Sequence, residues 1–198
     1  RKMKPKAPFT TASLQQTAYS SLGFSVRQTS SIAQRLYQGM QLGGDNVVGL
    51  ISYMRTDSTT LSKECLDDVQ KYIKSNHPAF ATSEERKYTK KVKNAQEAHE
   101  AIRPTSIENT PEKVKKYLED QEYKLYELIW KRTVASQMTD AVYNQVTFEF
   151  NLEEKYDFKY SGSFLKENGF KEVYNLSEND EKDKANKKIL ADLKVNDN

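Results

Sequence analysis

The spacing of apolar residues changes near Gln137, and this change limits the fold more than any other feature of the sequence. Before it, apolar residues recur every three or four positions, which is typical of amphipathic α-helices. After it, apolar and polar residues alternate, which is typical of strands with one solvated face. The sequence therefore predicts an α+β chain, with a mainly α-helical domain over residues 9–136 and part of a small antiparallel β domain formed by residues 1–8 and 137–198.

Two short helices are expected at the start of the helical part. Thr10, Thr11 and Ser13 supply N-cap chemistry for the first helix, and Gly23 ends it. Thr29 or Ser30 is expected to open the second helix, whose apolar face extends to Met40. Two helices joined by a turn that contains glycine form the outline of a helix-turn-helix.

A hairpin is predicted directly after this helix pair. The turn-forming run Gly43-Gly44-Asp45-Asn46 precedes apolar residues from Val47 onward, which indicate a returning strand. A helix pair followed by a hairpin is the element order of a winged helix. The sequence therefore predicts a winged-helix-like (CAP-like) domain.

The stretch from Gly49 to Ser62, GLISYMRTDSTTLS, holds the first candidate functional residues. If the returning strand continues through it, Tyr53, Arg55 and Asp57 share one face, because successive side chains of a strand point to opposite faces. A fixed cation beside a phenol favours the phenolate and stabilises negative charge on phosphoryl oxygens. This face could therefore attack a phosphate; the alternative is an ordinary strand with an exposed ion pair.

The stretch AQEAHEAIRPT, residues 95–105, holds the second group of candidates. As one short helix it places His99 and Arg103 on the same face, four residues apart, and Pro104 ends it. A histidine beside an arginine can grip a phosphate. The alternative is a structural or simply exposed histidine.

Two more helices are predicted in the helical part. The first follows the N-cap Ser62 and ends before Pro78, with Cys65 on its buried stripe. The second runs without a break from about Pro111 to about Ser136.

The C-terminal part is expected to supply the strands of the antiparallel sheet, at residues 142–150, 158–164, 169–174 and 189–195. The acidic residues near position 180 lie in a loop rich in lysine and asparagine, which indicates a solvated loop and no metal site; they are Asp180, Glu181 and Asp183.

Composition excludes several classes of protein. One cysteine and two histidines exclude an intramolecular disulfide and a Cys/His zinc cage. No apolar run approaches the ~20 residues that span a bilayer, so no membrane partner is expected. A net charge of +3 is compatible with nucleic acid but does not indicate it. The opening RKMKPKAP lacks an initiator methionine, so we expect a piece of a longer polypeptide.

The motifs resemble those of a known family and stand in the same order. From Pro8 to about Thr139 the chain is similar to bacterial type IA DNA topoisomerases, through PFTTASLQQTAYSSLGFS, TSSIAQRLYQGM, GLISYMRTDSTTLS and NAQEAHEAIRPT. The resemblance implies that Tyr53 is the catalytic nucleophile, that Arg55 contacts the scissile phosphate, and that His99 approaches the same phosphate. It implies a further DNA contact for Arg103.

The resemblance also implies an activity. Such an enzyme breaks one DNA strand through a 5′-phosphotyrosine link, passes a strand and reseals the break without ATP, which relaxes negative supercoils. The helical domain would be the cleavage domain, and the strand-rich part would belong to the hinge of a toroidal arch. Mg²⁺ is the expected cofactor of the complete enzyme, but its toprim module has no equivalent here, so we expect the isolated fragment to be inactive and to hold no metal.

The same resemblance implies the surroundings in which the chain works. The expected partners are DNA, especially single-stranded DNA, and the remaining domains of the same polypeptide. A monomer in the bacterial cytoplasm, associated with the nucleoid, is expected.

Three alternatives compete with this interpretation. A tyrosine recombinase or type IB topoisomerase would show a His-x-x-Arg spacing before its tyrosine, whereas here Tyr53 precedes His99 and Arg103. A non-catalytic winged-helix DNA-binding module would need a basic recognition helix. The third alternative is a fragment that only scaffolds a partner.

Overall fold

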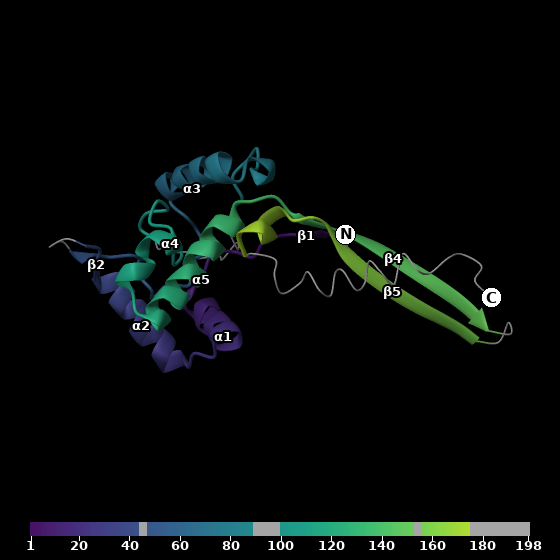
Figure 1. The fold of residues 1–198 in the computed structure, drawn as a ribbon, viewed down its shortest axis with the longest axis horizontal. Coiled ribbons are helices and arrows are strands. Elements are labelled where there is room, and N and C mark those ends of the chain that lie inside the picture. The colour runs from purple at the N-terminus through teal and green to yellow at the C-terminus, as the bar shows by residue number, and fades with distance from the viewer. Residues whose placement is uncertain (44–46, 89–99, 153–155, 175–198) are drawn as a thin grey trace, which may run out of the picture. The chain divides into compact units, whose positions relative to one another are not determined.

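The computed structural model describes residues 1–43, 47–88, 100–152 and 156–174 of the 198-residue chain. Its contacts divide the chain into two compact units, which we call the helical unit (Lys6–Met138) and the strand unit (Arg1–Pro5 with Thr139–Asn198). Helices in the first and an antiparallel sheet in the second make this an α+β protein, as predicted (Figure 1). Among the described residues, no helix has both the length and the apolar character to cross a lipid bilayer.

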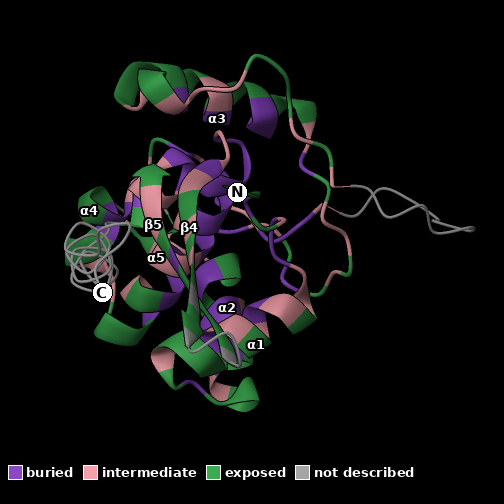
Figure 2. Cartoon of the chain, turned by 90° about the vertical axis from the view of Figure 1, so that its right-hand side faces the viewer, coloured by how far each residue is buried: buried purple, intermediate pink, exposed green. Residues whose placement is uncertain are grey.

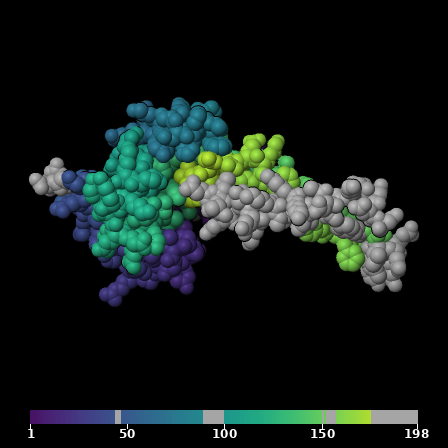
Figure 3. All heavy atoms as spheres, in the orientation of Figure 1, coloured from purple at the N-terminus to yellow at the C-terminus, as the bar shows by residue number. Residues whose placement is uncertain are grey.

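The helical unit is built from five α-helices among its described residues, with short 3-10 turns after α3 and α4. They are α1 (Thr11–Leu22), α2 (Val26–Gln38), α3 (Lys63–Asn76), η1 (Pro78–Phe80), α4 (Pro111–Val114), η2 (Lys115–Tyr117) and α5 (Asp120–Ser136). In the space-filling view of Figure 3, the α4–α5 region forms a continuous surface with α3 on one side and α1 on the other.

The first helix has the predicted ends, and the second does not. Thr10 caps α1, and Gly23 ends it in the left-handed conformation, with φ 71°. The predicted start of α2 at Thr29 or Ser30 is wrong, because Ser25 accepts a hydrogen bond from the Gln28 amide and opens the helix one turn earlier. Thr29 lies inside the helix, where its hydroxyl donates to the Ser25 carbonyl.

The predicted hairpin is present but short. Strands β2 (Met40–Gln41) and β3 (Val47–Val48) pair antiparallel, so Met40 belongs to a strand and not to the face of α2. The strand predicted to continue to Asp57 ends at Val48. The chain beyond it follows a different course, which determines the geometry of the candidate site.

The third helix agrees with its prediction, because Ser62 caps α3 and Cys65 is buried. The single long helix predicted from Pro111 to Ser136 is wrong, because Leu118 is extended between η2 and α5. The helix restarts where the Glu119 amide donates to the Glu122 carboxylate. Glu122 is itself buried, with one oxygen 2.8 Å from Nε of Arg35, so a contact distant in sequence fixes the new helix start.

Helix α5 forms the centre of the helical unit, with one side buried against α1, α2 and α3 (Figure 2). Trp130 is 4% exposed, and its indole N–H donates to the Ile107 carbonyl. Its ring meets Tyr72 of α3 edge to face, with centroids 5.2 Å apart. Apolar burial of this kind is the main contribution to folding stability.

The strand unit contains one antiparallel sheet of strands β1 (Lys2–Met3), β4 (Ala141–Leu152) and β5 (Tyr156–Glu167), in the order β1-β4-β5. The strand predicted at residues 169–174 is wrong, because this stretch forms the 3-10 helix η3 (Gly169–Tyr174). Gly169 turns the chain with φ 50°, and a Cβ there would lie 2.2 Å from the Asp140 carbonyl oxygen. The strand predicted at 189–195 and the acidic residues near 180 lie outside the described residues.

Candidate functional site

The candidate tyrosine follows a short antiparallel pairing between residues 50–52 and residues 103–105. The Ser52 amide donates to the Arg103 carbonyl at 2.8 Å, and the Thr105 amide donates to the Leu50 carbonyl at 3.0 Å. Ile51 and Pro104 face each other between these bonds, at a position where neither residue needs an amide hydrogen. A proline is therefore tolerated in the middle of this pairing.

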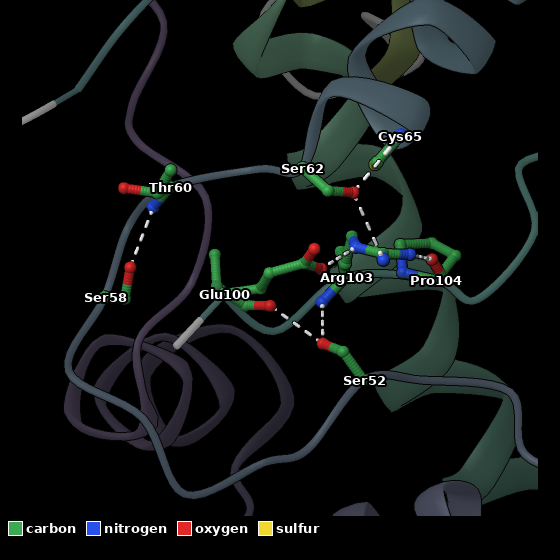
Figure 4. A network of polar contacts seen from close by, with 9 residues as sticks. Ser52, Ser58, Thr60, Ser62, Cys65, Glu100, Arg103 and Pro104 are labelled. Atoms are coloured by element: carbon green, nitrogen blue, oxygen red, sulfur yellow. Dashed lines mark hydrogen bonds and ion pairs between the residues drawn. The ribbon is translucent and has the colours of Figure 1, made fainter. Parts of the chain in front are cut away.

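The side chain of Ser52 ends this pairing (Figure 4). In a regular continuation the Arg103 amide would donate to the Ser52 carbonyl. It donates instead to Oγ of Ser52, at 3.0 Å, and the Ser52 hydroxyl donates to the Ala101 carbonyl, at 2.8 Å. The predicted strand through Tyr53 and Asp57 is therefore wrong, because a side-chain hydroxyl takes the place of the next ladder bond.

The hydroxyl of Thr11 binds the backbone on both sides of Arg55. Oγ1 of Thr11 donates to the Met54 carbonyl at 2.7 Å and accepts from the Thr56 amide at 2.9 Å. The Thr11 amide donates to the Thr56 carbonyl at 2.8 Å. The backbone on both sides of Arg55 is thus fixed to the start of α1.

Although the predicted strand is absent, the segment still has an exposed side and a buried side. Met54 is buried at 7% exposure, whereas Tyr53, Arg55 and Asp57 are exposed. The structure therefore brings these three residues onto the solvent side of a segment anchored by Ser52 and Thr11.

Tyr53 lies against the C-terminal end of α2. It is 46% exposed, and its ring meets Tyr37 at 5.4 Å with an angle of 66° between the planes. The Leu50 amide donates to the Leu36 carbonyl, and a Cβ on Gly49 would lie 2.8 Å from the Tyr37 carbonyl oxygen. The close approach at Gly49 explains why a residue without a side chain stands there.

Arg55 lies at the border of two surface hollows. One, of about 330 Å³, lies between α1, α2 and Met54, and the other is lined by residues 10–12 and 56–57. Within the described part of the chain, its guanidinium makes no hydrogen bond and no ion pair. An anion could therefore reach this cation without displacing a protein partner.

The helix predicted for residues 95–105 is wrong where the structure describes it, from Glu100 onward. Residues 100–105 form no helix, and Ile102 is bridged to Phe9 and Pro104 is bridged to Ile51. The residue before a proline avoids helical geometry. In addition, the bridges to Phe9 and Ile51 use backbone groups that a helix would bond internally. His99 lies outside the described residues, so its predicted approach to Arg103 on one helix face has no support here.

Arg103, unlike Arg55, is bonded to neighbouring groups, and Figure 4 shows its contacts with Glu100, Pro104 and Ser62. Its side chain is 18% exposed, and Nε lies 2.5 Å from a carboxylate oxygen of Glu100. Nη1 donates to the Pro104 carbonyl at 3.0 Å, and Nη2 donates to Oγ of Ser62 at 3.4 Å. Burial lowers the pKa of Arg103, but the hydrogen bond to Glu100 and the charges of the nearby acidic groups together raise it by more, so the pKa lies above its ordinary value.

Sequence reasoning missed three residues that shape this site: Thr11, Ser52 and Glu100. From the sequence, Thr11 is expected only as one of the residues at the start of a helix, and Ser52 has no predicted role. The available signal was a hydroxyl side chain inside an otherwise apolar run, since such side chains compete for backbone hydrogen bonds. In the described residues, no group of three or more His, Cys, Asp or Glu side chains could hold a metal ion.

Known proteins resemble this chain over its whole length. A family model described as DNA topoisomerase matches residues 1–198. The DNA topoisomerase 1 of Rickettsia felis is 47% identical over 196 residues, which cover 98% of this chain and 25% of that protein. The DNA topoisomerase 1 of Campylobacter jejuni is 41% identical over 199 residues, which cover 100% of this chain and 27% of that protein.

A solved structure gives the same result. The full-length topoisomerase I from Thermotoga maritima aligns with a TM-score of 0.74 and 38% sequence identity, over 88% of this chain and 28% of that chain. The chain therefore spans about a quarter of the length of the relatives it matches.

Proposed function

The chain belongs to the bacterial type IA DNA topoisomerases, and we propose that it supplies the nucleophile with which a longer enzyme breaks and rejoins one strand of DNA. The observation that carries this proposal is the shared exposure of Tyr53 and Arg55 on a segment whose backbone is held at both ends. A nucleophile and a cation held in a fixed relation are what attack on a phosphodiester requires.

The reaction consists of two transfers of one phosphoryl group. Oη of Tyr53 attacks the phosphorus, the bond to the 3′ oxygen breaks, and the 5′ side of the break stays on the tyrosine as a phosphate ester. In the second transfer the 3′ hydroxyl attacks this ester and the phenol leaves. The phenol loses one proton and regains one, and the ester conserves the bond energy, so the cycle needs no ATP.

Arg55 is proposed to bind the phosphate during both transfers. Negative charge grows on the phosphoryl oxygens as the tyrosine attacks, and a guanidinium matches these oxygens with two parallel hydrogen bonds. The hollow of about 330 Å³ beside Arg55, lined by Gln15, Ser30 and Gln34 among others, leaves space for an adjoining nucleotide.

His99 is proposed as a second contact to the same phosphate, on the strength of the family motif alone. The residue after it, Glu100, begins the segment whose Ala101 and Arg103 are bonded to Ser52, next to the tyrosine. This connection supports the proposal. For Arg103, the bonds to Glu100, Pro104 and Ser62 favour a supporting role over a direct DNA contact.

Mg²⁺ serves this family, but the described residues offer no cluster that fits it. We place the metal on other parts of the enzyme and route no step of the reaction through it here. The isolated chain should therefore form no covalent adduct when it is incubated with a single-stranded oligonucleotide and Mg²⁺. An adduct through Tyr53 under these conditions would overturn this part of the proposal.

The two units receive different roles in this proposal. The helical unit, with its winged-helix-like order of α1, α2 and hairpin, would be the cleavage domain that lifts to let a strand pass. The strand unit would contribute to the hinge in the arch of the toroid. The whole enzyme would act as a monomer on single-stranded regions of nucleoid DNA and relax negative supercoils.

A non-catalytic winged-helix DNA-binding module is the competing function. Such a module needs several cations on its recognition helix, whereas α2 carries two, Arg27 and Arg35, and Arg35 is held at 2.8 Å by the buried Glu122. This contact favours a structural use of that cation.

Relaxation of a negatively supercoiled plasmid by the full-length enzyme distinguishes the two functions. Tyr53→Phe should abolish relaxation, because the phenyl ring keeps its packing but has no nucleophile. Tyr37→Phe is the matched control, since its ring touches that of Tyr53, and this variant should stay active. Relaxation by Tyr53→Phe would contradict the proposed function.

A further inference from the structure

We propose that the hydroxyls of Ser52 and Thr11 are positioning groups, which hold Tyr53 and Arg55 in a backbone course that a continued strand would not give. This inference rests on the proposed function, because it assigns a purpose to the anchors of the same segment. Neither residue touches the reacting atoms, so both act through the backbone.

The Ser52 hydroxyl both accepts and donates a backbone hydrogen bond. It accepts the Arg103 amide at 3.0 Å and donates to the Ala101 carbonyl at 2.8 Å, immediately before Tyr53 (Figure 4). Alanine at this position would leave the Arg103 amide without its acceptor. The carbonyl of residue 52 is the acceptor that a regular antiparallel pairing would offer next, so the pairing would be free to extend and draw Tyr53 into it.

The Thr11 hydroxyl likewise accepts one backbone hydrogen bond and donates another, on the C-terminal side of Tyr53. It donates to the Met54 carbonyl at 2.7 Å and accepts the Thr56 amide at 2.9 Å, so one side chain spans the peptide groups on both sides of Arg55. The Thr11 amide adds a bond to the Thr56 carbonyl at 2.8 Å. The start of α1, which is held by its own cap, therefore fixes the backbone of the arginine.

Between the two hydroxyls only three residues remain: Tyr53, Met54 and Arg55. Met54 is buried at 7% exposure and its carbonyl is bonded to Thr11, so packing and hydrogen bonds together hold this tripeptide. The side chains of Tyr53 and Arg55 are exposed, and the backbone of this tripeptide determines where they start. Displacement of a reacting group by about 1 Å can slow an enzymatic reaction by about 100-fold.

The test is the rate at which the full-length enzyme forms its covalent adduct with an excess of labelled single-stranded oligonucleotide in one turnover. Ser52→Ala and Thr11→Val should each slow this step by ~10- to 100-fold. The Kd for the same oligonucleotide, measured with each substitution placed in the Tyr53→Phe background so that no adduct forms, should change by less than ~2-fold, because both hydroxyls are already bonded to backbone groups. Ser52→Thr and Thr11→Ser keep the hydroxyl and should restore the rate.

Ser58→Ala is the matched control. Ser58 lies in the same segment and its hydroxyl accepts the Thr60 amide at 3.1 Å, but it holds no peptide group next to Tyr53 or Arg55. Its adduct rate should equal that of the unaltered enzyme. All rates are measured well below the lowest Tm of the set, so that loss of fold does not enter the comparison.

Several results would overturn the inference. These are an unaltered adduct rate in Ser52→Ala and Thr11→Val, an equal loss in Ser58→Ala, or a failure of Ser52→Thr and Thr11→Ser to recover the rate. If Ser52→Ala does not fold, Ser52→Cys replaces it; its weak S–H donor and longer bond should still slow the step, and an unaltered rate would contradict the proposal. An adduct formed by Tyr53→Phe would refute the proposed function instead, so the two failures are distinguishable.

Discussion

Arg55 and Arg103 lie on two segments that adjoin Ser52, and the structure gives them opposite surroundings. Arg55 is exposed beside two hollows, with no ion pair among the described residues. Arg103 is 18% exposed in its side chain and is bonded to Glu100, Pro104 and Ser62. One guanidinium can meet a phosphate, and the other holds the protein together.

This difference shows that a motif locates an arginine but does not assign its role. Both residues stand in motifs of the same family, and the sequence predicted a DNA contact for each. Burial and existing hydrogen bonds distinguish the two arginines. The guanidinium of Arg103 already makes three bonds, so few of its N–H groups are free to bind a ligand. The following predictions test this separation.

The largest effect is expected for Arg55→Ala. Loss of a charge-stabilising donor in a reaction of this kind costs ~100- to 1,000-fold in rate, so formation of the covalent adduct by the full-length enzyme should fall by that factor. The Tm should not change, because the side chain is exposed. A lowered Tm with an unaltered rate would reverse the roles of the two arginines.

Arg103→Ala should give the opposite pattern. It leaves a partly buried Glu100 carboxylate without its partner, which lowers the free energy of unfolding by about 1–3 kcal/mol. Thermal or urea unfolding of this chain measures the change. The control is Lys113→Ala, whose pair with Glu108 is exposed and 3.7 Å long, and it should have almost no effect.

A smaller effect is expected where the exposed tyrosine packs on its neighbour. Tyr37→Ala removes the edge-to-face contact with Tyr53 and should slow adduct formation by ~2- to 10-fold, which corresponds to an aromatic pair worth about 0.5–1.5 kcal/mol. Tyr37→Phe keeps the ring and should keep the rate. Equal loss in both variants would show that the phenol of residue 37 matters and not the packing.

A further prediction concerns the thiol of Cys65, which lies near Arg103 and does not take part in the reaction. Burial raises the pKa of the Cys65 thiol to about 11, against the partial opposition of Arg103. Iodoacetamide at pH 8 should therefore alkylate the folded chain about 100-fold more slowly than the urea-unfolded chain. Alkylation at similar rates would contradict the burial of this thiol.

The raised pKa of the Cys65 thiol also makes the stability of the fold depend on pH in the alkaline range. Because the folded pKa lies above the unfolded one, the unfolded chain loses its thiol proton first, and stability falls as the pH rises from about 9 to about 11. Burial also raises the pKa of tyrosines such as Tyr72 and Tyr123, so the Cys65→Ala variant must be compared at each pH. A smaller loss of stability in that variant over this range is the expected result.

Local signals in the sequence predicted most of the fold. Thr10, Gly23 and Ser62 act through neighbours within four residues, and the ends they set for α1 and α3 agree with the structure. The hairpin at β2 and β3 and the paired strands β4 and β5 were also predicted correctly. The motifs identified the family, which the comparisons confirm.

Two of the errors involve a partner distant in the sequence, whereas the wrong start of α2 involves the local cap Ser25. The break before α5 depends on Arg35 reaching Glu122, and the end of the strand before Tyr53 depends on Ser52 reaching Arg103. No local periodicity records such contacts. For the same reason, the sequence located Tyr53 and Arg55 but not the hydroxyls that hold them.

The most direct test of the account is to map the tyrosine that becomes attached to DNA. The full-length enzyme is incubated with a single-stranded oligonucleotide, the adduct is trapped with denaturant and digested, and the modified peptide is sequenced by mass spectrometry. The account predicts that, of the 12 tyrosines in this chain, only Tyr53 carries the 5′-phosphonucleotide. Attachment to Tyr37, whose ring lies 5.4 Å away, or to any other tyrosine would contradict it.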